Sequence, residues 1–151
     1  MDNITHLASK FRAAIDTAKN AGKFRGDARF CGFPRGCCDD ASVLLAQFLL
    51  GYGIITHSVN GTYRDDVPEN IQPHEWLSAN NQIIDITGDQ FRFEPIFSNY
   101  EIPSVYVGPE DDFHRLFCER LPDRENKGID ALGHNSHQRL WWLYQTITEY
   151  I

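Results

Sequence analysis

The sequence contains no apolar run long enough to cross a membrane. The longest candidate, Val43 to Ile55, is interrupted by Gln47, Gly51 and Gly53, whereas a spanning helix needs about 18 or more consecutive apolar residues. The N-terminal residues also lack the basic and apolar segments of a signal peptide. We therefore expect a cytoplasmic protein without a membrane partner, although export by another route stays open.

Positive charge is scarce as well. The 14 Lys and Arg residues are outnumbered by 21 Asp and Glu residues, so the formal net charge is −7. A surface that follows nucleic-acid phosphates needs clustered Lys and Arg side chains. The composition therefore argues against a nucleic-acid partner.

Cysteines are few, at positions 31, 37, 38 and 118. This number is too small for a disulfide scaffold in a chain of this length, and a disulfide between the adjacent Cys37 and Cys38 would be strained. Zinc sites need paired cysteines at short spacing followed by a second pair, and that pattern is missing. We expect reduced thiols, and neither a metal nor another cofactor.

The remaining composition is that of a globular protein. The chain has 151 residues, of which 42% are hydrophobic and 23% are charged. That is enough for one domain, residues 1–151, with a buried core. Apolar residues at three- and four-residue steps predict four helices: 3–21, 38–50, 112–121, and a last one that Ser136 caps and that ends at Ile151.

The middle of the chain is predicted to form β-strands. Segments rich in β-branched residues flank two turn signals, Asn60-Gly61 and Asn80-Asn81. They predict two hairpins, which pair 54–59 with 62–64 and 73–78 with 82–87. A long connection anchored by aromatic residues, 88–104, precedes one more strand at 104–107. Helices followed by antiparallel strands and further helices predict an α+β fold.

Two thiols lie where a loop meets the apolar helix 38–50. Cys37 and Cys38 follow Pro34 and Gly36, and the unpaired N–H groups and dipole at a helix start stabilise the nucleophilic thiolate. The competing interpretation is that small buried cysteines only fill space. Position at a helix end does not decide which of the two adjacent thiols faces a cleft.

A reactive thiol needs a base, and histidine is the usual one. His57 and His74 lie in predicted strands. The other histidines lie near helices or polar loops and are expected at the surface: His6, His114, His134 and His137. The hairpin that contains His74 makes it the stronger candidate.

The register of this hairpin groups three functional residues. With a two-residue loop at 80–81, Trp76 faces Asp85 and His74 faces Thr87 across the two strands. Side chains alternate between the faces of a sheet, so His74, Trp76 and Asp85 share one face, with His74 and Asp85 as diagonal neighbours. A loop one residue longer or shorter would separate them.

Asp85 also stands out by its neighbours. It interrupts the apolar run Ile83-Ile84-Asp85-Ile86, where an unpaired carboxylate would be costly to bury. A histidine partner would satisfy the carboxylate, and the carboxylate would orient the imidazole. The alternative is that Asp85 faces water on an exposed strand. Together the three residue types favour a Cys-His-Asp thiol enzyme.

The ordered set of motifs resembles the transglutaminase-like superfamily of papain-like thiol enzymes, and is similar to lasso-peptide leader peptidases. The resemblance covers residues 34–91. The motifs that carry it are Gly36-Cys37-Cys38, Gly53-Ile54, His74-Glu75-Trp76 and Asp85. Alignment of the Gly-Ile pair without a gap places the nucleophile at Cys38.

The resemblance implies a papain/transglutaminase-like fold, in which a buried helix that begins at the nucleophile packs on an antiparallel sheet. It implies that Cys38, His74 and Asp85 act as nucleophile, base and orienting acid on peptide or glutaminyl amides, through an acyl-enzyme. A protease, a deamidase and a transglutaminase would all use these residues on a peptide or protein substrate. Trp76 and Gln90 are candidate substrate contacts. The alternative function is a non-catalytic binding module that retains the fold.

Overall fold

The protein is built on one antiparallel sheet. The computed structural model describes residues 3–151, apart from the side chain of His134. The strands follow the order β4-β3-β2-β1-β5, and β6 also pairs with β1. Their bounds are β1 His57–Tyr63, β2 Gln72–Ala79, β3 Gln82–Asp85, β4 Tyr106–Gly108, β5 Glu119–Arg120 and β6 Arg124–Glu125.

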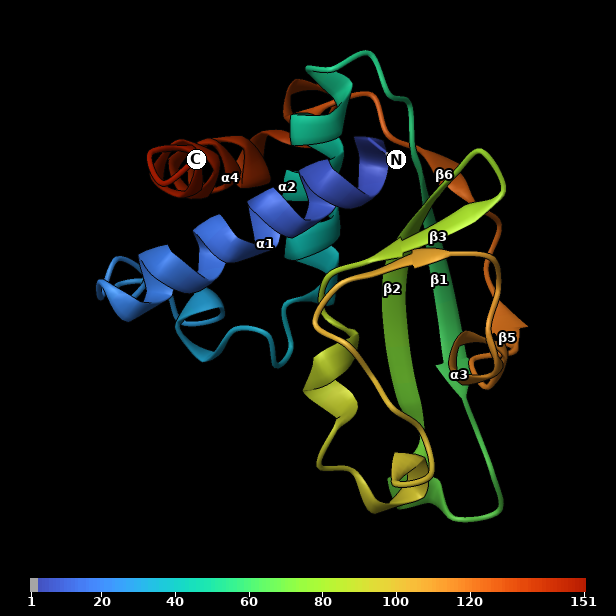
Figure 1. Cartoon of the computed structure of the whole chain (residues 1–151). Helices are drawn as coiled ribbons and strands as arrows, with labels where there is room; N and C mark the ends of the chain where they lie inside the picture. Colours follow the sequence, from blue (N-terminus) through green and yellow to red (C-terminus); the bar gives the residue numbers. More distant parts are fainter. Residues whose placement is uncertain (1–2) are drawn as a thin grey trace.

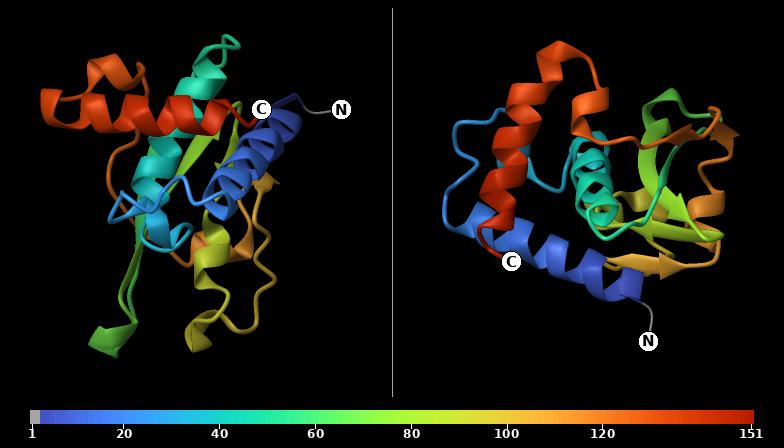
Figure 2. Two further views of the ribbon diagram at one scale, coloured as in Figure 1. Left: turned by 90° about the vertical axis from the view of Figure 1, so that its left-hand side faces the viewer. Right: turned by 90° about the horizontal axis from the view of Figure 1, so that it is seen from above.

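Three helices lie on one side of this sheet, where two of them contact the strands and the third packs on those two helices (Figures 1 and 2). They are α1 (Asn3–Asn20), α2 (Cys38–Leu50) and α4 (His134–Thr148), while the short α3 (Asp112–Arg115) lies near β5. Helices and an antiparallel sheet confirm the predicted α+β class. In residues 3–151 no helix combines the length and apolar character that a membrane crossing requires.

Helix α2 lies at the centre of the helical layer. It begins at Cys38 and ends at Leu50, as predicted, and Leu44, Leu45 and Leu49 are almost completely buried. These side chains pack in one cluster with Leu77 of β2. Because burial of each such side chain contributes about 1.5–3 kcal/mol, the position of Cys38 relative to the sheet is well determined.

The opposite face of the sheet carries a second cluster, rich in aromatic residues. Trp76 of β2 and Ile83 of β3 alternate with the residues that face α2. They pack with Phe91 and Phe97 from the predicted connection 88–104 and with Phe117. We call these residues, together with Val59, Ile102 and Phe113, the aromatic cluster.

The hairpin of β2 and β3 has the predicted register. Leu77 pairs with Ile84, Ser78 with Ile83 and Ala79 with Gln82. The loop residues Asn80 and Asn81 have φ values of 53° and 60°, as a two-residue type I′ turn requires. His74, Trp76 and Asp85 therefore point to the same face.

The prediction of a turn at Asn60-Gly61 is wrong. Both residues lie inside β1, where Asn60 pairs with Glu75 and Gly61 with His74. The glycine allows the backbone of Phe117 to approach β1 closely, since a Cβ at position 61 would lie 2.5 Å from the carbonyl oxygen of Phe117. The glycine that suggested a turn is thus needed for close packing within the sheet instead.

The C-terminal half departs from the predicted bounds in three places. The helix expected at 112–121 is confined to Asp112–Arg115, because Glu119 and Arg120 pair with β1 as strand β5. The strand expected at 104–107 is Tyr106–Gly108. The last helix begins at His134, so Ser136 does not cap it, and it ends at Thr148 instead of Ile151.

Candidate active site

The two adjacent cysteines occupy different environments. Cys37, which precedes α2, is completely buried, and its sulfur donates to the carbonyl oxygens of Arg29 at 3.2 Å and Arg35 at 3.4 Å. Cys38, the first residue of α2, is half-buried and lines a cleft of about 660 Å³. Of the two thiols, Cys38 is the one that a ligand in the cleft can reach.

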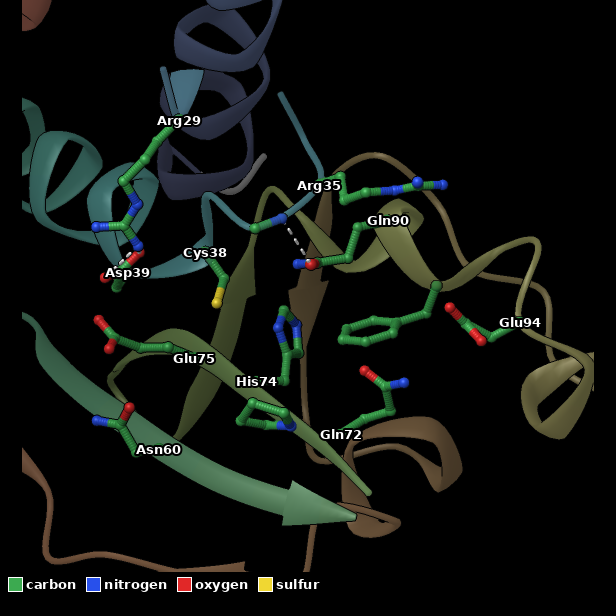
Figure 3. A pocket seen from close by; sticks show the side chains of 13 residues that line it. Arg29, Arg35, Cys38, Asp39, Asn60, Gln72, His74, Glu75, Gln90 and Glu94 are labelled. Atoms are coloured by element: carbon green, nitrogen blue, oxygen red, sulfur yellow. Dashed lines mark hydrogen bonds and ion pairs between the residues drawn. The ribbon is translucent and has the colours of Figure 1, made fainter. Parts of the chain in front are cut away.

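His74 lines the same cleft. Strand β2 pairs with β3 only from Leu77 to Ala79, so the edge of β2 beside His74 is left without a β3 neighbour and borders the cleft. The sulfur of Cys38 lies in this cleft between the side chains of His74 and Glu75 (Figure 3). The buried helix thus brings its first residue to the open end of the strand.

His74 and Asp85 form a buried hydrogen-bonded pair. Nε2 of His74 lies 2.7 Å from Oδ2 of Asp85, and the two side chains are 0% and 2% exposed. Oδ1 of Asp85 accepts the N–H of Thr87 at 2.9 Å. Burial acts to raise the pKa of Asp85, but the neighbouring imidazoles of His74 and His114 outweigh it and hold this pKa well below its usual range.

This pairing assigns the protons on His74. An ionised carboxylate only accepts hydrogen bonds, so Nε2 of His74 is the protonated nitrogen. Nδ1 is buried without a hydrogen-bond partner among residues 3–151, and in a neutral imidazole with this tautomer it is the nitrogen that carries the lone pair. An imidazole in this tautomer has a free basic nitrogen at the cleft.

A second histidine contacts the same carboxylate. Nε2 of His114 lies 2.7 Å from Oδ2 of Asp85, and Nδ1 of His114 lies 2.6 Å from Oδ1 of Asp111. Burial acts to lower the pKa of His114, but the contacts with Asp85 and Asp111 outweigh it and raise this pKa.

The prediction that His114 is a surface residue is wrong, because its side chain is only 2% exposed. The one-turn helix α3 places it beside the aromatic cluster. A local signal was present: Asp111 stands three residues earlier and caps α3 through the N–H of His114. By contrast, His6 is exposed as predicted, and the side chain of His134 lies outside the described part of the chain.

The surroundings of Cys38 keep its thiol protonated at rest. Burial raises the pKa of Cys38 to about 11; a hydrogen bond from the backbone N–H of Glu75 acts in the opposite direction, and the negative charges of Asp39 and Glu75 add to the increase. The thiolate therefore requires a base that takes the proton. His74 lines the same cleft, and its Nδ1 has no hydrogen-bond partner among residues 3–151.

Glu75 is a cleft residue for which the sequence suggested no role. The residue is 7% exposed, and its Oε2 has no hydrogen-bond partner among residues 3–151. Burial, and then the negative charge of Asp39, raise the pKa of Glu75 to about 7. A carboxyl group beside Cys38 thus changes its charge near neutral pH.

The two predicted substrate contacts lie in different places. Gln90 lines the cleft, where its Oε1 accepts the N–H of Gly36 at 3.4 Å and its Nε2 donates to the carbonyl oxygen of Thr87 at 3.1 Å (Figure 3). Trp76 is 2% exposed within the aromatic cluster, and its ring packs edge-on against that of His114 with 4.8 Å between ring centroids. The structure brings Gln90 to the cleft and places Trp76 beneath the histidines.

Within residues 3–151, one group of side chains could hold a metal ion. The ligand atoms of His74, Asp85 and His114 lie within 4.8 Å of one another, and imidazole nitrogens with a carboxylate suit Zn²⁺. Both Nε2 atoms, however, are engaged by the same Asp85 oxygen. A metal at this place would have to replace both hydrogen bonds.

Comparison of the chain with models of protein families, with curated proteins and with solved structures finds no match in any of the three.

Proposed function

We propose that this protein is a thiol hydrolase or acyltransferase, in which Cys38 is the nucleophile, His74 the general base and Asp85 the orienting acid. One observation carries the proposal. Cys38 and His74 line one cleft, while His74 is fixed from behind by its 2.7 Å hydrogen bond to Asp85 and keeps a free Nδ1. A base held in this way beside a thiol can take the thiol proton.

The proposed reaction follows from these roles. Nδ1 of His74 takes the proton of the Cys38 thiol, and the sulfur attacks the carbonyl carbon of an amide. The imidazolium then gives its proton to the leaving amine, and an acyl-enzyme remains on Cys38. Water or an amine attacks the thioester, with His74 again accepting and returning the proton. The backbone N–H of Cys38, at the start of α2, is the candidate donor to the oxyanion.

We also propose that the fold is papain/transglutaminase-like. A buried helix that begins at Cys38 packs against an antiparallel hairpin that carries His74 and then Asp85, which is the order that the sequence resemblance implies. The substrates that fit this proposal are peptides or proteins, attacked at a peptide or glutaminyl amide. Hydrolysis then corresponds to a protease or deamidase, and transfer to an amine corresponds to a transglutaminase.

A second function, a non-catalytic binding module, is favoured by a different observation. The pKa of Cys38 is raised to about 11 by burial, and a thiol that stays protonated does not react. This alternative and the proposed enzyme differ in whether His74 activates Cys38.

Alkylation separates the two functions. Iodoacetamide at mildly acidic pH, with peptide mapping by mass spectrometry, gives a rate for each thiol. Cys31 and Cys118 are exposed and serve as reference thiols in the same molecule. The enzyme proposal expects Cys38 to react faster than both references, and Cys38→Ala, but not Cys37→Ala, to remove the fast phase. A Cys38 that reacts more slowly than the references supports the binding module.

A further inference from the structure

Three short hydrogen bonds join the cleft to the far side of the sheet. They run from Oδ1 of Asp111 to Nδ1 of His114 at 2.6 Å, from Nε2 of His114 to Oδ2 of Asp85 at 2.7 Å, and from Asp85 to Nε2 of His74 at 2.7 Å. The side chains of His114, Asp85 and His74 are at most 2% exposed, whereas that of Asp111 is 31% exposed. The outer end of this chain is thus near solvent and its inner end is the proposed base.

The partners assign the charge of His114. Both of its ring nitrogens face carboxylate oxygens, and a neutral imidazole has only one N–H to donate. His114 is therefore an imidazolium that donates to Asp111 and to Asp85. The carboxylate of Asp85 thus accepts one hydrogen bond from His74 and a second one from the positively charged ring of His114.

His114 is held firmly in this place. Its ring packs edge-on against the rings of Trp76 and Phe113, with 4.8 and 5.1 Å between ring centroids. It also stacks on the ring of Tyr106, with 5.5 Å between centroids. Nη2 of Arg120 donates to its carbonyl oxygen at 3.1 Å. The charged and titratable groups that contact it among residues 3–151 include Asp111, Asp85, Arg120, Tyr106 and His74, whose ring stacks on that of His114 with 6.2 Å between ring centroids.

We propose that His114 is a positioning residue, which acts on Cys38 through Asp85 and His74. The inference rests on the proposed function of these three residues. The N–H of His114 holds Oδ2 of Asp85 on the line to His74, so the imidazole of His74 keeps its free nitrogen toward the cleft. The positive charge of His114 also stabilises the negative charge of Asp85, so Asp85 remains an acceptor for the N–H of His74.

Two substitutions separate the hydrogen bond from the charge. His114→Gln places an amide N–H near the position of Nε2 and keeps a donor for Asp85, without the charge. His114→Asn places its amide near Nδ1, so it keeps the contact with Asp111 and loses the one with Asp85. Both variants are neutral and leave the thiol unchanged.

The test compares alkylation of Cys38, relative to Cys31 in the same molecule, as a function of pH. His114→Asn should slow alkylation of Cys38 by roughly 10- to 100-fold, by analogy with the loss of the outer-shell partners that orient metal-binding histidines. His114→Gln should stay closer to the wild-type rate, with the acidic limb of its pH profile moved to higher pH. Wild-type rates and profiles in both variants would overturn the inference and leave the proposed function standing.

A second measurement does not depend on the thiol. In Cys38→Ala protein, nuclear magnetic resonance should detect both ring N–H protons of His114 and the Nε2 proton of His74 as hydrogen bonded. His114→Asn in this background should shift the His74 resonance, and His114→Gln should shift it less. A His114 with a single ring proton would overturn the inference, whereas an unreactive Cys38 in the wild type would overturn the proposed function.

Discussion

Gly61 lies directly opposite His74 in the ladder of β1 and β2. A side chain at position 61 would meet not only the carbonyl oxygen of Phe117 at 2.5 Å but also its Cβ at 2.8 Å. Phe117 belongs to the segment that follows α3, the helix that holds His114 against Asp85, and this segment can approach β1 so closely only because residue 61 has no Cβ. A glycine in β1 thus allows the contact between two distant histidines and one carboxylate.

Gly61→Ala should therefore destabilise the fold and loosen the site. Because the added carbon meets backbone, we expect a loss of about 1–3 kcal/mol in the free energy of unfolding, measured by urea denaturation. Gly26→Ala is the matched control, since a Cβ there meets nothing within 4 Å, and it should change stability by no more than about 0.5 kcal/mol. Equal stability of the two variants would contradict the close approach.

Asp85→Asn tests the orienting acid. The amide keeps the size of the side chain but removes the charge that matches His114 and fixes the tautomer of His74. We expect alkylation of Cys38 to slow by about 100-fold or more, the scale of general-base catalysis, while the rates at Cys31 and Cys118 stay unchanged. An undiminished rate at Cys38 would show that Asp85 does not support the base.

Glu75 should make stability depend on pH in a defined direction. Its pKa is raised from 4.5 to about 7, so the folded state binds the proton more tightly than the unfolded state does. The resulting stabilisation is complete below about pH 4.5 and is lost as the pH rises through about 7. Glu75→Gln keeps the neutral form, so it should match the wild type at pH 4 and exceed its unfolding free energy at pH 8 by on the order of 3 kcal/mol.

The same variant should affect the thiol. The negative charge of Glu75 contributes to the raised pKa of Cys38, so Glu75→Gln should speed alkylation of Cys38 above pH 7 and have little effect below pH 5. A wild-type alkylation profile, or a stability difference that shrinks as the pH rises, would contradict this description of Glu75.

Substitution of Arg12, an ion-pair residue outside the cleft, should strongly lower the free energy of unfolding. Its guanidinium contacts Asp89 at 2.8 Å and donates to the carbonyl oxygens of Ile86 and Ser104 at 2.7 and 3.0 Å. These bonds attach to α1 the connection 88–104, which contains Gln90. Arg12→Met leaves a buried carboxylate without a partner and should cost about 3–5 kcal/mol of unfolding free energy.

Asp16 provides the control for this change. It also pairs with Arg12, at 3.1 Å, but its side chain is 47% exposed, so Asp16→Asn should cost only about 0–1 kcal/mol. A comparable loss of unfolding free energy in both variants would show that the stabilisation by Arg12 does not depend on its buried pair with Asp89.

The parts of the site that could be predicted depend on local signals. Helix α2 starts and ends where the Gly-rich flanks and the apolar stripe indicate, and the register of 73–85 follows from a two-residue turn and strand alternation. These rules were enough to place His74 and Asp85 on one face. Both features involve residues close in the sequence, where few alternative arrangements compete.

The rest depends on contacts between distant segments. The link between His114 and Asp85 spans 29 residues, and strand pairing of Glu119 with β1 shortens the helix expected there. Gly61 was misread because a turn and a close packing contact both select glycine. The raised pKa of Glu75 likewise depends on its burial and on the charge of Asp39 in the first turn of α2, a residue distant in sequence that no local pattern brings to Glu75.

The most direct test of the account is intact-mass spectrometry after incubation with a peptidyl vinyl sulfone, a probe that requires an activated thiol, followed by peptide mapping of the adduct. The account predicts a single adduct at Cys38 in the wild type and in Cys37→Ala, and none at that position in His74→Ala, although Cys38 is still present there. An adduct at Cys37, or labelling of Cys38 that does not depend on His74, would contradict it.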